Sequence, residues 1–331
     1  MTTMNHRVVL ASRPQGGISP ANFRLEAVPV PEVGPGEVLV RVRFLSLDPY
    51  MRMKMNDVKS YTPPQVLDEV MVGGTVGEVV ASNNPRFAPG DAVAGGGGWQ
   101  EFHLSDGKAL RKVDRSLPLE AYLGPAGMPG VTAWHGIFNI IAPKAGETVL
   151  ISAAAGAVGS VAGQLVKSVG ARAVGVAGGP DKCRHAVEVL GYDACIDYRA
   201  DLAGQMAKAV PNGIDGIFEN VGGAVMDAAL KHINVFGRIA LCGLVSGGYN
   251  AEPMPIRDAT VLLTQRVMLR GFILSDHLDV FPRALADLGA RVASGHLKWH
   301  RTVAKGIAAA PEAFIGMLGG ANLGKQLVDL G

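Results

Sequence analysis

Hydrophobic and polar positions follow one pattern before residue 125 and another after it. In the first part, short apolar runs such as residues 38–44 alternate with polar residues, and Gly or Pro turns separate the runs. Alternation with a period of two is typical of half-buried strands. Residues 72–81 and 92–94 are further predicted strands. Short strands joined by such turns predict a partly open β-barrel.

After residue 125, residues 127–138 look like a turn that enters a helix, and from residue 147 onward strand and helix patterns alternate. Residues 181–190 and 225–233 are two of the predicted helices. The predicted strands are residues 149–152, 173–177, 214–219, 238–243 and 268–272. Because strands and helices alternate, we expect an α/β fold with a parallel, doubly wound sheet.

The change of pattern also predicts the domains. We expect a first domain over residues 1–125 and a second over residues 126–295, which a chain of 331 residues is long enough to form. Residues 296–331 return to strand-like and amphipathic segments, and we expect them to rejoin the first domain.

The first predicted strand of the second domain leads into a turn of small residues and then into a helix. Ala154, Gly156 and Gly159 occupy the glycine positions of the G-x-G-x-x-G pattern, so alanine replaces the first glycine. Small residues let the backbone approach a pyrophosphate, and a helix N-terminus offers free N–H groups. Strand, small-residue turn and helix together predict a dinucleotide-binding unit.

The end of the second strand indicates which dinucleotide is bound. An NAD site usually has Asp or Glu about 20 residues past the glycines, where it holds the ribose 2′-hydroxyl. Gly178 stands there instead and Lys182 follows, which favours the 2′-phosphate of NADP(H). Tyr198, after the next strand, is a candidate for the same pocket. The alternative for Lys182 is a solvent-exposed side chain that binds no ligand. The alternative for Tyr198 is an aromatic residue that only packs at the end of a strand.

Polar residues also follow two later strands, at the edge where doubly wound sheets bind ligands. Asn220 and Ser246 are therefore candidates for contact with ribose or nicotinamide. Turn formation is the alternative explanation, because Asn and Ser both favour turns.

Composition narrows the class of protein. A content of 48% hydrophobic and 18% charged residues indicates a large core, and a formal net charge of +2 gives no support for nucleic-acid or membrane binding. No apolar run reaches the length of a membrane span, and residues 1–7 lack a signal-peptide core. The three cysteines, Cys183, Cys195 and Cys242, are widely spaced, which is typical of reduced thiols in a cytoplasmic protein.

A catalytic zinc ion needs three protein ligands from one site. The cysteines all fall in the second domain, and no four lie close together in the sequence. His296 and His300 are spaced to share a helix face, but no third ligand accompanies them. We therefore expect a metal-free enzyme.

Taken together, several segments resemble the zinc-independent branch of the medium-chain dehydrogenase/reductase superfamily. This branch contains leukotriene B4 hydroxydehydrogenases (prostaglandin reductases), alkenal double-bond reductases and curcumin-reductase-like enzymes. The resemblance spans nearly the whole chain. Its most specific segments are Asp48-Pro49-Tyr50-Met51-Arg52 and Met128-Pro129-Gly130-Val131-Thr132-Ala133. The others are Trp99-Gln100-Glu101-Phe102, residues 152–159, Glu219-Asn220-Val221-Gly222-Gly223, residues 314–318 and Asn322-Leu323-Gly324-Lys325.

The resemblance implies a GroES-like catalytic domain, a Rossmann domain, NADP(H) as cofactor and a homodimer paired through an edge strand, for which residues 268–272 are the candidate. It assigns Lys182 and Tyr198 to the 2′-phosphate. The other expected cofactor-binding residues are Met128, Thr132, Ala154, Gly156, Ala157, Val158, Gly159, Asn220, Cys242, Gly243, Leu244, Ser246, Phe272, Leu274 and Asn322. A family tyrosine-asparagine pair is matched by Tyr249-Asn250.

The resemblance leads to a hypothesis for the reaction: NADPH reduces the C=C bond of an α,β-unsaturated ketone or aldehyde. Hydride adds to the β-carbon, and donors aimed at the carbonyl oxygen stabilise the enolate that develops. Tyr50, Tyr61 and Tyr249 are the candidate donors or acids on the substrate side, and packing is the alternative role for each. A quinone reductase and a non-catalytic NADPH-binding protein remain as alternative functions, and a zinc alcohol dehydrogenase is the least favoured.

Overall fold

The computed structural model describes residues 3–247 and 254–331. The chain folds as two compact units: unit 1 comprises Met1–Leu123 and Arg301–Gly331, and unit 2 comprises Gly124–His300. Unit 2 is therefore one continuous stretch inserted between the two parts of unit 1.

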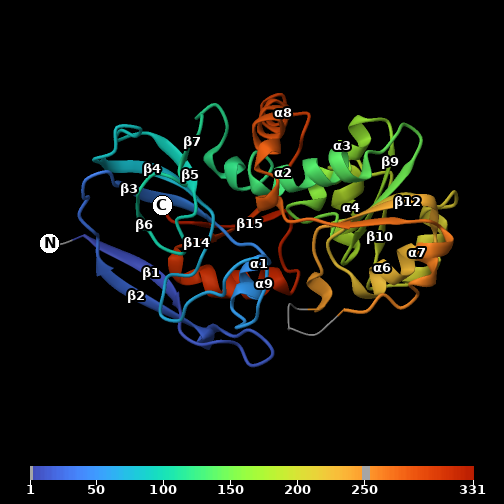
Figure 1. The fold of residues 1–331 in the computed structure, drawn as a ribbon, viewed down its shortest axis with the longest axis horizontal. Helices are drawn as coiled ribbons and strands as arrows, with labels where there is room; N and C mark the ends of the chain where they lie inside the picture. The colour runs from blue at the N-terminus through green and yellow to red at the C-terminus, as the bar shows by residue number, and fades with distance from the viewer. Residues whose placement is uncertain (1–2, 248–253) are drawn as a thin grey trace. The chain divides into compact units, whose positions relative to one another are not determined.

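Unit 2 is built on a six-stranded sheet in the order β10-β9-β8-β11-β12-β13, with every neighbouring pair parallel. Figure 1 labels three of these strands, β9, β10 and β12. The strands are β8 (Thr148–Ser152), β9 (Arg172–Ala177), β10 (Ala194–Asp197), β11 (Ile214–Glu219), β12 (Ile233–Leu241) and β13 (Met268–Gly271). In chain order this is the 3-2-1-4-5-6 arrangement of a dinucleotide-binding sheet. The α/β class and the doubly wound sheet predicted from the sequence are confirmed.

Helices cover both faces of this sheet. They are α2 (Met128–His135) with its π-helical continuation η3 (Gly136–Ile141), α3 (Gly159–Ser168), α4 (Pro180–Glu188), α5 (Leu202–Ala209), α6 (Gly223–Leu230), α7 (Thr260–Thr264) and α8 (Phe281–Ala293). Unit 2 has two hydrophobic cores, and alternate residues of β8 belong to one or the other. Val149 and Ile151 pack with α2, α3 and α8, while Leu150 packs with α5 and α6. Continuous apolar strands arise because both faces are buried.

The bounds of α6 and β12 differ from those predicted. Helix α6 stops at Leu230, and Ile233 already belongs to β12. The predicted start of that strand at residue 238 was therefore wrong. The exposed Val235 and Phe236, the latter with φ of +64°, interrupt the apolar pattern that marks a buried strand.

Unit 1 contains a seven-stranded sheet in the order β14-β15-β3-β4-β5-β7, with β6 paired to β3, and a separate β1-β2 hairpin. Its strands are β1 (Met4–Leu10), β2 (Phe23–Pro29), β3 (Val38–Ser46), β4 (Thr75–Ser82), β5 (Ala92–Gly95), β6 (Phe102–Ser105), β7 (Arg111–Lys112), β14 (Arg301–Lys305) and β15 (Lys325–Asp329). Its α-helices are α1 (Tyr50–Lys54) and α9 (Ala310–Leu318). Strand β4 begins at residue 75 rather than 72, since the Val72 N–H donates to the Gln65 side chain instead of a strand.

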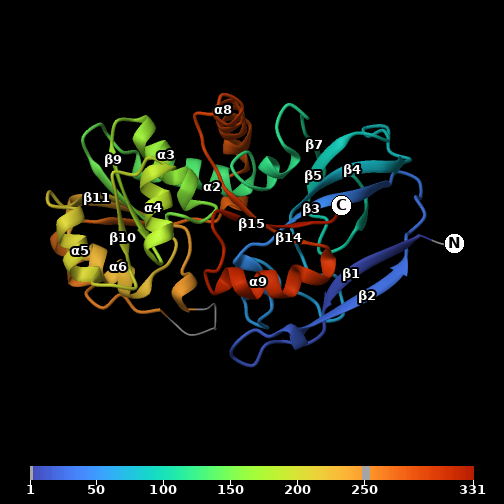
Figure 2. The same ribbon diagram turned by 180° about the vertical axis from the view of Figure 1, so that it is seen from behind.

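The C-terminal segment completes unit 1. Strand β15 pairs antiparallel with β3 and parallel with β14, and Figure 2 shows α9, β14 and β15 in red with the blue strands of the first part. Phe314 of α9 meets the Trp99 ring edge-on with centroids 5.5 Å apart, and Phe23 stacks on Trp99 at 5.4 Å. Both ends of the chain thus share one core.

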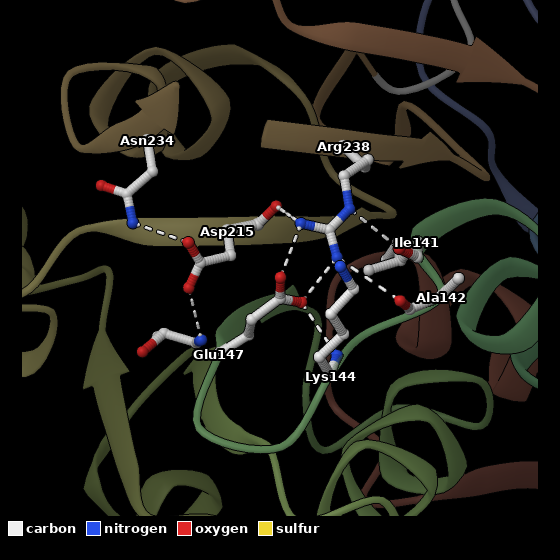
Figure 3. Close-up of polar contacts among 8 residues, drawn as sticks. Ile141, Ala142, Lys144, Glu147, Asp215, Asn234 and Arg238 are labelled. Atoms are coloured by element: carbon white, nitrogen blue, oxygen red, sulfur yellow. Dashed lines mark hydrogen bonds and ion pairs between the residues drawn. The ribbon is translucent and has the colours of Figure 1, made fainter. Parts of the chain in front are cut away.

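One ion pair and its surrounding hydrogen bonds tie the starts of β8 and β11 to β12 and η3 (Figure 3). The Arg238 guanidinium of β12 binds Glu147 (2.6 Å) and donates to the backbone carbonyls of Asp215 in β11 (3.1 Å) and Ile141 in η3 (3.0 Å). Asp215 accepts from the Thr148 N–H at 2.8 Å. Arg238 therefore satisfies carbonyls at the end of η3, which have no partner within the helix. The candidate site lies at the opposite, carboxyl-terminal ends of the strands.

Candidate cofactor site

The turn between β8 and α3 is built by small side chains. A Cβ at Gly159 would lie 2.3 Å from the Ala153 carbonyl oxygen, so only glycine lets the start of α3 approach the turn. Ala153 itself has φ of +51°, an uncommon conformation for a residue with a side chain. Ala154, which replaces the first glycine of the pattern, is fully buried, and its methyl group occupies the space that Gly175 leaves open.

This turn fits a dinucleotide. Gly159 acts as the third glycine of the pattern, which allows close contact between helix and strand. The predicted residues Gly156, Ala157 and Val158 lie in the turn itself. The first N–H groups of α3 follow directly, at the helix end that favours a pyrophosphate.

A basic cluster, defined here as Lys182, Tyr198 and Arg199, lies at the ends of β9 and β10. The Tyr198 ring covers Gly178, where a Cβ would come within 2.8 Å of the tyrosine oxygen. The Arg199 guanidinium lies 5.9 Å from the centre of the Tyr198 ring. Burial, and secondarily the charge of Arg199, lower the pKa of Lys182. Two cations and a phenol are a donor set that suits a phosphate.

Asp197 holds the loops of this cluster together. One oxygen of its carboxylate accepts the N–H groups of Gly179 (2.8 Å) and Arg199 (3.0 Å). These two hydrogen bonds lower the pKa of Asp197. Asp197 therefore holds the loops of the basic cluster through their backbone, and it is not the acid of an NAD site, because Gly178 stands at the position of that acid after β9.

The centre of the sheet edge lies between β8 and β11, where the strand order reverses and such sheets bind ligands. Asn220 donates from its side chain to the Ser152 carbonyl (2.8 Å), and its backbone N–H donates to the Ser152 hydroxyl (2.7 Å). The same hydroxyl donates to the fully buried Glu219 at 2.7 Å. Ser152 therefore locks the end of β11 to the dinucleotide turn.

Glu219 organises the turn that follows β11. Its Oε1 accepts from the N–H groups of Val221 (2.6 Å) and Gly222 (2.8 Å) as well as from Ser152, while its buried Oε2 has no partner among the described residues. Burial raises the pKa of Glu219 against the effect of these hydrogen bonds.

The turn after β12 lies on the turn after β11. The N–H groups of Cys242 and Gly243 donate to the Glu219 carbonyl at 2.8 and 3.1 Å, and the Ser246 N–H donates to the Val221 carbonyl at 3.0 Å. Burial, and next the Glu219 charge, raise the pKa of Cys242 to about 12, so its thiol stays protonated at neutral pH. Hydrogen bonds thus bring together residues from the ends of three strands: Ser152 of β8, Asn220 after β11 and residues 242–246 after β12.

Other predicted cofactor residues have different surroundings. Met128 is exposed at the start of α2, and the Thr132 hydroxyl donates to its carbonyl at 2.8 Å. The side chains of Phe272 and Leu274 are buried in the core beside α2, which leaves only their backbone for a ligand. Asn322 belongs to unit 1, where its side chain donates to the Gly324 carbonyl at 2.7 Å.

Two of the candidate catalytic tyrosines, Tyr50 and Tyr61, lie in the same part of unit 1. Tyr50 starts α1 and is largely buried, whereas Tyr61 is 52% exposed. Burial, followed by the charges of Asp48 and Tyr61, raises the pKa of Tyr50 well above its ordinary value. Tyr249 and its neighbour Asn250 lie outside the described residues.

The two histidines considered as zinc ligands do not share a helix face. Helix α8 ends at Ala293, so His296 and His300 follow it in irregular chain, and that prediction was wrong. His296 binds the Ser294 hydroxyl, and His300 meets the ring of His185. Within residues 3–247 and 254–331, no three His, Cys, Asp or Glu side chains group as metal ligands. In the same ranges, no helix is long and apolar enough to cross a membrane.

The sequence interpretation missed three features of the site. Arg199 follows directly after Tyr198, and a basic residue beside a candidate phosphate ligand was the available signal. Glu219 stands before Asn220, but its role depends on a tertiary contact with Ser152 that no spacing shows. Cys183 and Cys195, treated as widely spaced, lie in contact.

Comparison with known proteins agrees with this geometry. Residues 6–113 match a family described as the N-terminal domain of oxidoreductase, and residues 157–290 match one described as zinc-binding dehydrogenase. The chain is 47% identical to the NADPH-dependent curcumin reductase of Escherichia coli K12, over 98% of this chain and 96% of that one. It is 38% identical to the NADP(+)-dependent 2-alkenal reductase of Nicotiana tabacum, over 90% of this chain and 88% of that one.

Among solved structures, CurA of Vibrio vulnificus in complex with NADPH superposes with a TM-score of 0.93 at 43% identity, covering 98% of this chain and 99% of that one. A dinucleotide turn in a doubly wound sheet, together with a β-sheet unit, defines a two-domain oxidoreductase. The chain belongs to the medium-chain dehydrogenase/reductase superfamily, in its curcumin-reductase-like branch.

Proposed function

We propose that this enzyme uses NADPH to reduce the C=C bond of α,β-unsaturated ketones or aldehydes. The observation that carries the proposal is the similarity, over nearly the full length of the chain, to an NADPH-dependent curcumin reductase and a 2-alkenal reductase. The basic cluster at the ends of β9 and β10 supports NADP(H) rather than NAD(H), because Gly178 stands where an NAD site has an acid.

Each part of the sheet edge has a proposed task. The small residues at 154–159 and the start of α3 receive the pyrophosphate, and the basic cluster receives the 2′-phosphate. Asn220 and residues 242–246, with the backbone of residues 272–274, contact the ribose and nicotinamide end, and Met128 and Thr132 complete the set of unit 2 residues. When bound, NADPH supplies the hydride that the β-carbon of the substrate accepts.

The protein must stabilise the negative charge that develops on the carbonyl oxygen of the substrate. Of the six tyrosines, Tyr122 and Tyr192 donate to backbone carbonyls and Tyr198 covers Gly178. Tyr50, Tyr61 and Tyr249 remain as donors to that oxygen or as acids for the α-carbon. The Tyr50 hydroxyl is protonated at neutral pH, as an ordinary tyrosine is, and burial raises its pKa further, so it can donate a hydrogen bond.

The test is a panel of an enone, a long-chain alkenal and a quinone, each assayed with NADPH and with NADH. We expect the enone and alkenal to be turned over with NADPH at a kcat/KM well above that for the quinone. Preference for the quinone would instead indicate a quinone reductase, and tight NADPH binding without any turnover would indicate a non-catalytic protein.

Tyr50→Phe, Tyr61→Phe and Tyr249→Phe identify the donor. Loss of a hydrogen bond to a developing oxyanion lowers kcat by about 10²–10³, so one variant should fall far below the others. Tyr122→Phe is the matched control, since its hydroxyl is committed to the Asp114 carbonyl at 2.6 Å. Wild-type rates in all three variants would assign protonation to water and donation to other groups.

We further propose a cytoplasmic homodimer that works without a metal. Three cysteines without a disulfide among them are consistent with a reducing compartment. Strand β13 lies at the edge of the unit 2 sheet and offers unpaired backbone groups to a second copy. Elemental analysis of the purified protein tests the absence of a metal, which stoichiometric zinc would contradict.

A further inference from the structure

Two of the three cysteines meet beside the basic cluster. Cys183 lies in α4 and Cys195 in β10, and their sulfur atoms are 3.1 Å apart although twelve residues separate them in the sequence. Both are free thiols, and both side chains are partly exposed. The Cys195 thiol donates to the Cys183 sulfur, so the two side chains already point toward each other.

We propose that Cys183 and Cys195 are a site of reversible oxidation, in which a peroxide converts the two thiols into an intramolecular disulfide. One thiolate attacks the peroxide and becomes a sulfenic acid, releasing water or an alcohol. The second thiol then displaces water from that sulfenic acid and forms the S–S bond. In total, two thiols lose two electrons and two protons, and one peroxide is reduced with its O–O bond broken. Thiol exchange with a small dithiol reverses the modification.

Cys183 is the sulfur that reacts first. Burial raises the pKa of both thiols, and the increase is larger for Cys195. The Cys195 sulfur packs against Gly175 of β9. Since the thiolate is the nucleophile, the less shielded Cys183 supplies it, and Cys195 resolves the sulfenic acid. The rate of oxidation should therefore rise with pH through the alkaline range.

The disulfide would join the two elements that carry the basic cluster. Lys182 directly precedes Cys183, and Tyr198 and Arg199 follow Cys195 by a few residues. A disulfide has an S–S distance of about 2.05 Å, so the sulfurs must approach by about 1 Å from their contact distance. Asp197 holds Gly179 and Arg199 on both sides of the cluster, so this movement reaches the residues that we assign to the 2′-phosphate.

The first measurement tests the modification alone, whatever the cofactor. Reduced protein treated with hydrogen peroxide, then denatured, should fall from three titratable thiols to one, and peptide mapping should show a 183–195 cross-link that is lost on reduction. Cys183→Ser and Cys195→Ser should each abolish the cross-link, while Cys242→Ser should retain it. Three surviving thiols, or a cross-link that includes Cys242, would overturn the proposal.

The second measurement tests the effect on the cofactor and rests on the proposed function. In the oxidised protein we expect the Kd for NADPH to rise by about tenfold, or about 1.4 kcal/mol, with little change for NADH. Reduction should restore the original value, which separates the disulfide from irreversible damage. A cross-link that leaves the ratio of the two Kd values unchanged would refute the coupling. Equal Kd values for NADPH and NADH in the reduced protein would instead contradict the assignment of the basic cluster.

Discussion

Gly159 and Gly178 show that an absent side chain can serve two purposes in one site. At Gly159 any Cβ would strike the Ala153 carbonyl, so glycine is required for the backbone to close. At Gly178, which stands where an NAD site has an acid, a Cβ would strike the Tyr198 ring, so glycine makes room for that ring. The first requirement is general to dinucleotide turns, and we propose that the second belongs to the choice of cofactor.

Lys182→Ala should weaken binding of NADPH but not of NADH. A hydrogen bond to a charged group contributes about 1.5–3 kcal/mol, so the Kd for NADPH should rise by about 10- to 100-fold. Arg184→Ala is the matched control, because Arg184 lies on the same helix and pairs with Asp181. Fluorescence titration with both cofactors measures the effect, and an equal loss for NADPH and NADH would place Lys182 outside the phosphate site.

Glu219→Gln should change how stability depends on pH. The folded-state pKa of Glu219 is raised by burial, whereas a glutamate in the unfolded chain has a pKa of about 4.3. A carboxyl of this kind stabilises the fold below the unfolded pKa and loses that contribution as pH rises toward the folded pKa. Glutamine keeps an oxygen for the three donors and cannot ionise. The wild type should therefore lose stability relative to Glu219→Gln as pH rises above about 4.3.

Urea unfolding at several pH values measures this difference. Glu219→Ala is the second variant, and it should be less stable at every pH because three donors lose their acceptor. Parallel pH profiles for the wild type and Glu219→Gln would show that the carboxyl does not change its ionisation on folding.

Among the elements, α1 depends on a buried ion pair. Lys325 of β15 is 2% exposed and donates to Asp48 (2.6 Å) and to the Leu47 carbonyl (2.6 Å), directly before the helix that begins at Tyr50. The Ser46 hydroxyl also donates to Asp48. The last strand of the chain thus fixes the segment that carries a candidate catalytic tyrosine.

Lys325→Met should destabilise the protein by about 3 kcal/mol, because it leaves the Asp48 carboxylate without its cation. Adding Asp48→Asn should recover part of that loss. Lys305→Met, at an exposed position of the neighbouring strand β14, is the control and should change stability by less than about 0.5 kcal/mol. Chemical denaturation measures all three, and similar losses for Lys325→Met and Lys305→Met would refute a role for the ion pair.

The sequence predicted elements well where one rule decided the structure. Strands β8, β9 and β11 are apolar because both faces are covered, and each was located to within a residue. Strand β12 was placed too late because Phe236 adopts a positive φ and is exposed within the strand. Gly178 and Lys182 could be interpreted from spacing alone. The contact of Cys183 with Cys195 could not, since it depends on how α4 packs against β10.

At the level of the whole molecule, each of the two large sheets has an edge strand with an exposed apolar side chain. Strand β13 closes one end of the unit 2 sheet, and Met268 there is 42% exposed. Strand β14 closes one end of the unit 1 sheet, and Val303 there is 38% exposed. The proposed dimer uses only the first edge.

Met268→Lys should therefore shift the protein from dimer toward monomer, since a lysine on an edge strand opposes pairing with another chain. Val303→Lys is a matched change on the other edge and should leave the dimer intact. Sedimentation velocity over a range of protein concentrations measures both, with circular dichroism to confirm folding. A dimer that persists in Met268→Lys but dissociates in Val303→Lys would locate the interface on unit 1.

The insertion of unit 2 within unit 1 has a consequence for synthesis on the ribosome. Residues 124–300 are complete before β14 and β15 exist, so the unit that starts the chain cannot finish first. Until β15 is made, β3 lacks one of its neighbours and Trp99 lacks Phe314. Domains usually fold in the order of their synthesis. Here unit 2 can fold first, whereas unit 1 leaves β3 without its neighbour until β15 has been synthesised.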